Sequence, residues 1–192
     1  INEMLNKIGK ESKFVDGLRV TDKETIDVVQ MVLAGKVNKT LVNLLECKGG
    51  KAMGISGIDG RLIEAEVKDE RLGFVGNITK VNIKPITDLL EQGYIPVVST
   101  IGCDKKGDIY NINGDTAAAH IAGALGAVDD APGEVQPVGM AGAVLLFPGP
   151  GLQQQVGELS HQIGGVAVAQ EHLSPAVASV RRVRWCVPIL CL

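Results

Sequence analysis

Apolar residues recur three and four positions apart in several stretches of the chain, the spacing that places them on one face of a helix. Ile26, Val29 and Leu33 follow this spacing after Thr21–Glu24. That tetrapeptide has the form of a capping box, and Gly35 is a suitable helix stop. Over the whole chain the pattern predicts helices at residues 2–9, 21–35, 37–49, 84–91 and 116–125.

Short runs rich in β-branched and apolar residues lie between these helices and are typical of buried strands. Asp59-Gly60 is a hairpin signal, so the runs on either side of it are expected to pair antiparallel. The predicted strands are residues 52–56, 61–67, 72–76, 94–101 and 108–111. The alternation predicts an α/β fold with a mostly parallel sheet, helices on both faces and one antiparallel hairpin.

The composition of the chain changes after about Ala127. Every lysine lies at or before Lys106, and the later residues do not continue the alternation of strands and helices. Within them, residues 156–168 suit a short helix, and residues 177–187 suit an amphipathic or strand-like segment. We therefore expect residues 1–127 and 128–192 to be different parts of the protein.

Composition excludes several classes of function. The formal net charge is −3 and aromatic residues make up 3% of the chain, so nothing indicates binding to nucleic acid or to an anionic membrane surface. No apolar run reaches the roughly 18 residues of a membrane helix. The cysteines lack the spacing of a zinc site or a disulfide framework. We expect a cytoplasmic protein without a metal site.

Polar residues gather where a predicted strand meets the alanine-rich helix, in Tyr110–Ala118. Asn111, Asn113 and Asp115 lie there at the carboxyl end of the strand, where ligands bind in open α/β sheets. The helix N-terminus also offers free N–H groups and the positive end of the helix dipole to an anion. The alternative is a capped strand-to-helix turn, in which the same residue types are common.

A second candidate is the extended segment Phe14–Thr21, which contains Arg19. A guanidinium group donates two parallel hydrogen bonds to a carboxylate, so this arginine suits a small acidic ligand. The alternative is a surface arginine, but a cation just before a helix start is slightly unfavourable with the helix dipole. That conflict with a local rule raises the interest of Arg19 as a functional residue.

These two motifs and others, in one order along the chain, closely resemble the acetylglutamate kinases, a branch of the amino acid kinase family. The resemblance covers residues 1 to about 127. It rests on Gly17–Thr21, Gly35–Lys39, Gly54–Gly60, Gly73–Gly76, Gly93–Val98 and Asn111–Asp115. Other branches, such as the aspartokinases, share the architecture but not the Gly-Leu-Arg-Val-Thr segment.

The resemblance implies a three-layer αβα sandwich around a mainly parallel sheet, incomplete at both ends. Residues 1–127 would form part of the N-terminal lobe that binds N-acetyl-L-glutamate. Residues 128–192 would stand in place of the ATP-binding lobe, through a frameshift or alternative splicing. The implied reaction is phosphorylation of the substrate's side-chain carboxylate by ATP with Mg²⁺, in arginine biosynthesis, by an enzyme that is a homo-oligomer when intact.

The resemblance assigns roles to three residues. Arg19 would hold a substrate carboxylate, Asn111 would bind the substrate from the strand end, and Asp115 would act in catalysis by orienting the catalytic lysines. The hairpin about Asp59-Gly60 would form part of a lid over the substrate.

The chain departs from the family pattern in the lysines themselves. The first would precede Ile1, and no lysine follows Lys106 to supply the second. Removing one electrostatic stabiliser costs about a hundred- to a thousandfold in rate, so we expect essentially no kinase activity from this chain alone. Two alternatives stay open: a truncated, non-catalytic binding or regulatory module, and another amino acid kinase that acts on a different small acid.

Overall fold

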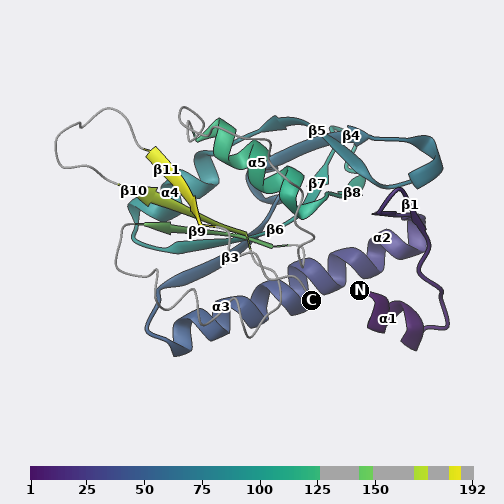
Figure 1. The fold of residues 1–192 in the computed structure, drawn as a ribbon, viewed down its shortest axis with the longest axis horizontal. Helices are drawn as coiled ribbons and strands as arrows, with labels where there is room; N and C mark the ends of the chain where they lie inside the picture. Colours follow the sequence, from purple (N-terminus) through teal and green to yellow (C-terminus); the bar gives the residue numbers. More distant parts are fainter. Residues whose placement is uncertain (126–142, 149–166, 173–181, 187–192) are drawn as a thin grey trace.

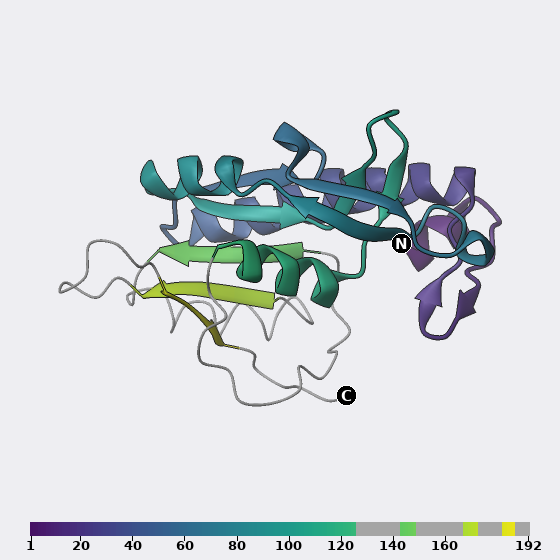
Figure 2. The ribbon, with the colours of Figure 1, turned by 90° about the horizontal axis from the view of Figure 1, so that it is seen from above.

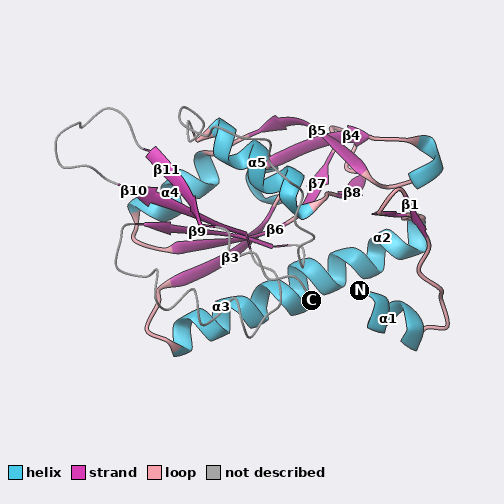
Figure 3. Cartoon of the chain, in the orientation of Figure 1, coloured by secondary structure: helices cyan, strands magenta, loops and turns pink. Residues whose placement is uncertain are grey.

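Helices lie on both sides of the strands in the computed structural model, which describes residues 1–125, 143–148, 167–172 and 182–186 (Figure 1). The helices are α1 (Asn2–Lys7), α2 (Lys23–Gln30), α3 (Asn38–Cys47), α4 (Lys84–Glu91) and α5 (Gly114–Ala124). The strands are β1 (Phe14–Val15), β2 (Leu18–Arg19), β3 (Ala52–Ser56), β4 (Ile63–Val67), β5 (Gly76–Val81), β6 (Ile95–Ser99), β7 (Ile101–Cys103), β8 (Ile109–Asn111), β9 (Ala143–Pro148), β10 (Ala167–His172) and β11 (Arg182–Cys186). Figure 3 shows helices and strands together in the fold, which confirms the expected α/β class.

The described strands form a five-stranded sheet in the order β11-β10-β9-β6-β3, a four-stranded sheet in the order β5-β4-β7-β8, and the two-stranded hairpin β1-β2. Parallel pairs join β3 to β6, β9 to β10 and β4 to β7. Antiparallel pairs join β6 to β9, β10 to β11, β4 to β5 and β7 to β8. Antiparallel pairing is therefore more extensive than the single predicted hairpin, because short connections between β4 and β5 and between β7 and β8 allow only that direction.

Among the described residues, two hydrophobic cores lie against the strands. One packs α4 and α5 against β4, β5, β6 and β8, with Ile86, Val98 and Ile121 fully buried. The other packs α1 and α2 against β7, with Leu5 and Ile101 at its centre. Figure 2 shows the long helix that begins with α2 on one side of the strands and α5 on the other, as expected for helices on both faces.

The helix that begins at Lys23 does not end at Gly35, contrary to the prediction. A π-helical segment, Met31–Val37, joins α2 to α3, so the helical backbone continues to Cys47. Glycine lowers helix stability by only about 1 kcal/mol relative to alanine. The side chains of Leu33 and Leu41, on either side of Gly35, are buried, and we attribute the continuity of the helix to this packing.

The predicted hairpin at Asp59-Gly60 is also wrong. Residues Asp59–Arg61 form a 3₁₀ turn, and the strands on either side of it belong to different sheets. The Asp59 carboxylate accepts hydrogen bonds from the Ser56 N–H (2.6 Å) and hydroxyl (2.9 Å), so it closes the end of β3 instead. The region 72–76 likewise differs from its prediction, since it leads into β5, which begins only at Gly76.

Residues after 125 contribute β9, β10 and β11, and β9 pairs with β6 in the five-stranded sheet. The strand-like segment predicted at 177–187 contains β11. Most of the helix predicted at 156–168 lies outside the described residues, and its last two residues belong to β10. No helix in the part of the chain that the structure describes is long and apolar enough to cross a membrane.

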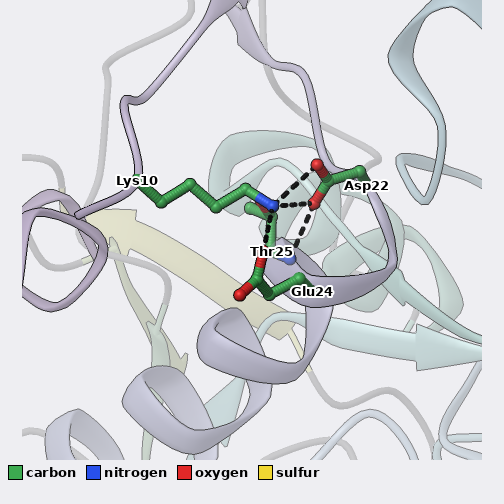
Figure 4. Close-up of polar contacts among 4 residues, drawn as sticks. All are labelled: Lys10, Asp22, Glu24 and Thr25. Carbon is green, nitrogen blue, oxygen red and sulfur yellow. Dashed lines mark hydrogen bonds and ion pairs between the residues drawn. The ribbon is translucent and has the colours of Figure 1, made fainter. Parts of the chain in front are cut away.

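The N-terminus of α2 is capped by Asp22, not by Thr21 as the capping-box prediction had it. The Asp22 carboxylate accepts a hydrogen bond of 2.8 Å from the Thr25 N–H. Lys10 reaches across to both Asp22 (2.7 Å) and Glu24 (2.7 Å), as Figure 4 shows. These hydrogen bonds lower the pKa of Asp22 from 3.8 to about 2, and the hydrogen bond from Lys10 has the largest effect. Thr21 instead joins the 72–74 segment through its backbone.

The long helix is attached to the five-stranded sheet through Asn38, which is 1% exposed. Its side-chain amide donates hydrogen bonds to the carbonyls of Ile55 (3.0 Å) and Val97 (2.8 Å), on the paired strands β3 and β6. Gly54 makes this approach possible, because a Cβ at that position would overlap Asn38 Oδ1. A buried amide whose hydrogen bonds are made in this way fixes helix and strands in one register.

Replacing Asp22 by alanine removes the cap and the ion pair, so we expect the free energy of unfolding to fall by about 1 kcal/mol. Because folding lowers the pKa of Asp22, its contribution is complete above about pH 4 and is lost as the pH falls towards about 2. Urea unfolding curves of parent and variant should differ at neutral pH and converge in acid. Asp22→Asn keeps a capping oxygen, so its free energy of unfolding should fall by less. An equal fall in both variants would contradict the capping role.

Two glycine substitutions should have opposite effects on stability. Gly54→Ala forces the Asn38 amide away from its two carbonyls, so we expect a loss of about 1–3 kcal/mol. Gly35→Ala is the matched control, because a Cβ there meets nothing within 4 Å. It should stabilise the helix by about 0.5–1 kcal/mol. Thermal melts of both variants test this, and a neutral Gly54→Ala would show that Asn38 does not hold the helix in place.

Candidate functional site

A cavity of about 450 Å³ lies where strand ends meet the long helix and the β1–β2 hairpin. Four parts of the chain form its walls. The lining residues are Ile1, Asn2 and Glu3 at α1; Phe14, Gly17, Leu18 and Arg19 of the hairpin; Val32, Leu33 and Val37 of the π-helical segment; and Val75, Thr100, Asn111, Ile112, Asn113 and Gly114 at the strand ends. One side of the cavity is thus apolar and helical, and the other carries amides, a hydroxyl and a helix N-terminus.

The β1–β2 hairpin presents Arg19 to the cavity. Asp16 (φ 51°) and Gly17 (φ 76°) form its two-residue turn, and positive φ at both positions is the signature of a type I′ turn. The turn pairs Phe14 with Arg19. The hairpin at this cavity is therefore Phe14–Arg19. Neither residue of the expected lid, Asp59-Gly60, lines the cavity.

Arg19 is a half-buried cation without an anionic partner among the described residues. Its Nη1 donates a hydrogen bond of 2.8 Å to the Ser12 hydroxyl, and its guanidinium stacks on the Phe14 ring at 4.7 Å. Burial lowers the pKa of Arg19, because desolvation disfavours the charged form. A guanidinium that is held in place, partly desolvated and left with free N–H groups favours binding of a carboxylate.

Asn111, the last residue of β8, lies on the same cavity as Arg19. Its backbone N–H donates to the Phe74 carbonyl (2.8 Å), which fixes the strand end. Its side-chain amide has one long contact of 3.5 Å, to the Thr21 hydroxyl. The structure thus brings together two of the three predicted site residues, although they are far apart in the sequence.

Asn113 and Gly114 also line the cavity, at the start of α5. Asn113 caps this helix by accepting hydrogen bonds from the Thr116 N–H (3.0 Å) and hydroxyl (3.1 Å). Helix geometry leaves the N–H groups of the first residues, Gly114 and Asp115, without intrahelical acceptors. The sequence pattern Asn-Ile-Asn-Gly-Asp signalled this helix start, but α5 begins at Gly114, earlier than the predicted Thr116.

Asp115, the third predicted residue, lies in the first turn of α5 and directly follows the lining residue Gly114. Its half-buried carboxylate has no hydrogen-bond or ion-pair partner in the described ranges. Burial raises the pKa of Asp115, since no cation there stabilises the charged form. Such a carboxylate is suited to pairing with an ammonium group from outside the described residues or from a ligand.

The apolar wall comes from Val32, Leu33 and Val37 of the π-helical segment, together with Val75. It can cover the hydrocarbon part of a small ligand while the opposite wall binds its polar ends. Neither this wall nor Thr100 was among the predicted site residues. Their place in the cavity depends on how the chain folds back on itself, and no local sequence motif predicts that place.

Among the described residues no group of three or more histidine, cysteine, aspartate or glutamate side chains could hold a metal ion. The lining of the cavity combines the Arg19 cation and the Glu3 carboxylate with three amides, a hydroxyl and a helix N-terminus, around an apolar wall. That donor set suits a small organic anion.

The cavity of this α/β fold lies at the carboxyl ends of strands, where proteins of this class bind small ligands. Residues 1–130 match the model of the amino acid kinase family, and the chain belongs to that family.

The known proteins that are similar to the chain include two acetylglutamate kinases and one protein of known structure. The acetylglutamate kinase of Brachyspira hyodysenteriae is 54% identical over 140 residues, which cover 69% of this chain and 49% of that protein. The acetylglutamate kinase of Clostridioides difficile is 55% identical over 139 residues, with the same coverage of 69% and 49%. The crystal structure of smu.665 from Streptococcus mutans UA159 is 26% identical, with a TM-score of 0.63, and the match covers 88% of this chain and 76% of that one.

The relatives confirm the resemblance to acetylglutamate kinases that the motifs indicated, and a kinase family implies the use of ATP. The chain spans about half the length of the curated relatives it matches.

Proposed function

We propose that this chain contributes the N-acetyl-L-glutamate-binding part of an acetylglutamate kinase. The observation that carries the proposal is the half-buried Arg19 guanidinium, which lies on a cavity of about 450 Å³ with Asn111 and has no anionic partner in the described part of the chain. The relatives named acetylglutamate kinase support the identity of the acid.

In this proposal the two ends of the ligand bind different walls. Arg19 donates two hydrogen bonds to one carboxylate, and Asn111 offers an amide donor and acceptor to the polar groups nearby. The methylene groups lie against Val32, Leu33 and Val37, where burial of apolar surface favours binding. The cavity thus selects for a short, acidic and partly apolar molecule.

The chemistry requires no general base. A side-chain carboxylate with a pKa near 4.3 is ionised at neutral pH and can attack a phosphoryl group directly. The protein must then align the nucleophile and supply positive charge to the transferring group. Asp115 is suited to holding ammonium groups in position for that purpose, because its carboxylate is half-buried and without a cation among the described residues.

ATP with Mg²⁺ is the phosphoryl donor that the family implies. The described residues do not fit Mg²⁺ by themselves, because no group of three or more histidine, cysteine, aspartate or glutamate side chains among them could hold a metal ion. We propose instead that the described residues bind and orient the acceptor acid, in a homo-oligomer of the complete enzyme.

A second candidate function is ligand binding without turnover, as in a regulatory module. No lysine follows Lys106 in the sequence, so residues 107–192 cannot supply an ammonium group to the transferring phosphoryl. Binding of N-acetyl-L-glutamate is common to both candidates, and turnover separates them.

Binding should depend on the shape of the Arg19 side chain as well as on its charge. Arg19→Ala should weaken binding of N-acetyl-L-glutamate by about 10- to 100-fold, because a hydrogen-bonded charge pair is lost. Arg19→Lys should recover only part of the lost affinity, since a lysine cannot form the two parallel hydrogen bonds. Isothermal titration calorimetry measures both.

Arg71→Ala is the matched control, because Arg71 is exposed, pairs with Asp69 at 2.6 Å and does not line the cavity. It should bind like the parent. An Arg19→Ala variant that binds as tightly as Arg71→Ala would overturn the proposed site.

Turnover should be undetectable with this chain alone. With ATP, Mg²⁺ and N-acetyl-L-glutamate, we expect no acyl phosphate above background, because no more than a small residual rate survives the loss of the charged groups around the phosphoryl. Trapping with hydroxylamine measures the product as a hydroxamate. A full-length relative assayed in parallel is the positive control, and measurable turnover by the chain would exclude the binding-only candidate.

A further inference from the structure

Thr100 connects β6 to β7 and forms part of the cavity wall. Its carbonyl accepts a hydrogen bond of 3.0 Å from the Ile112 N–H, which holds it beside the turn that carries Asn111 and Asn113. Its side chain is 0% exposed. Thr100 is therefore a fixed part of the polar wall, next to the start of α5.

The Thr100 hydroxyl is the one buried side-chain polar atom of the described residues that has no hydrogen-bond partner. Other buried hydroxyls nearby do have one: Thr21 donates to the Arg19 carbonyl (2.9 Å) and Ser56 donates to Asp59 (2.9 Å). A buried hydroxyl without a partner costs free energy, and native proteins contain few. Such an atom on a cavity wall is accounted for when a ligand supplies the partner.

The neighbouring helix start points to the same kind of ligand. Gly114 lines the cavity, and its N–H has no intrahelical acceptor. The N-terminus of α5 therefore presents a free donor and the positive end of the helix dipole on the wall that contains Thr100. A hydroxyl and a backbone N–H together can donate to one carboxylate.

We propose that the Thr100 hydroxyl donates a hydrogen bond to the side-chain carboxylate of the bound acid, beside the N-terminus of α5. Arg19, on another wall, holds the second carboxylate. The assignment rests on the proposed function and adds to it a residue that selects a dicarboxylate over a monocarboxylate. The ligand removes the unsatisfied hydroxyl from the ligand-free state, so part of the binding energy comes from relieving that cost.

The test compares Thr100→Val, which keeps the shape and removes the hydroxyl, with Thr100→Ser, which keeps the hydroxyl. Two ligands are titrated into the 192-residue chain by calorimetry or ligand-observed NMR: N-acetyl-L-glutamate and N-acetyl-L-2-aminobutyrate, which lacks the side-chain carboxylate. Thr100→Val should raise the Kd for the dicarboxylate by about tenfold and leave the Kd for the monocarboxylate unchanged. Thr100→Ser should bind both like the parent.

Thermal melts without ligand separate this role from a structural one. Because the hydroxyl has no partner in the described protein, Thr100→Val should melt at the same temperature as the parent or higher. A lower melting temperature with unchanged binding would make Thr100 a structural residue and overturn the assignment.

The remaining outcomes are equally decisive. Equal losses for both ligands, or no loss for either, would overturn the assignment of Thr100 while leaving the proposed function in place, provided that the parent binds N-acetyl-L-glutamate. A parent chain that binds neither ligand would overturn the proposed function, and the role of Thr100 with it.

Discussion

The attachment of the long helix to the sheet through Asn38 determines the geometry of the cavity. The Asn38 amide bonds the carbonyls of Ile55 and Val97 at 3.0 and 2.8 Å, so the helix cannot slide along β3 and β6 without breaking buried hydrogen bonds. The π-helical segment that directly precedes Asn38 supplies the apolar wall. β6, which Asn38 holds, ends beside Thr100 on the polar wall. One buried amide thus sets the separation between the two sides of the site.

Three polar groups at or beside the cavity stand in an arrangement that lowers the stability of the free protein. Arg19 is partly desolvated without an anion, Asp115 is partly desolvated without a cation, and the Thr100 hydroxyl has no partner among the described residues. By contrast, the charges of Lys10, Asp22 and Glu24 are paired with one another. Polar groups without a partner that lie at one cavity are characteristic of binding sites, because the ligand supplies the missing partners.

Local patterns in the sequence predicted the bounds of helices and strands correctly where the spacing of apolar residues and the flanking turn residues indicated the same element. The helix Lys84–Glu91 and the strand Ala52–Ser56 have the bounds that their apolar patterns predict. The sequence predicts an extended segment at Phe14–Thr21, where Asp16-Gly17 in fact turns a hairpin, and it predicts a hairpin at Asp59-Gly60, where none forms. The two Asp-Gly dipeptides look alike in sequence. What differs is the partner: Asp59 is held by Ser56 at the end of β3, a contact that only the folded chain reveals. The prediction that the helix ends at Gly35 failed for a similar reason. Packing of the helix on both sides of Gly35 outweighs the weak tendency of glycine to end a helix.

The site could be predicted in part for the same physical reasons. Arg19 and Asn111 stand out because a guanidinium before a helix and amides at a strand end are visible in sequence, and both line the cavity. Thr100 is not visible in this way, because an unsatisfied hydroxyl is a property of its surroundings. All residues that line the cavity lie at or before Gly114, and no lysine follows Lys106. In the proposed function, recognition of the acid therefore rests on residues up to Gly114, whereas an ammonium group for phosphoryl transfer cannot come from any residue after Lys106.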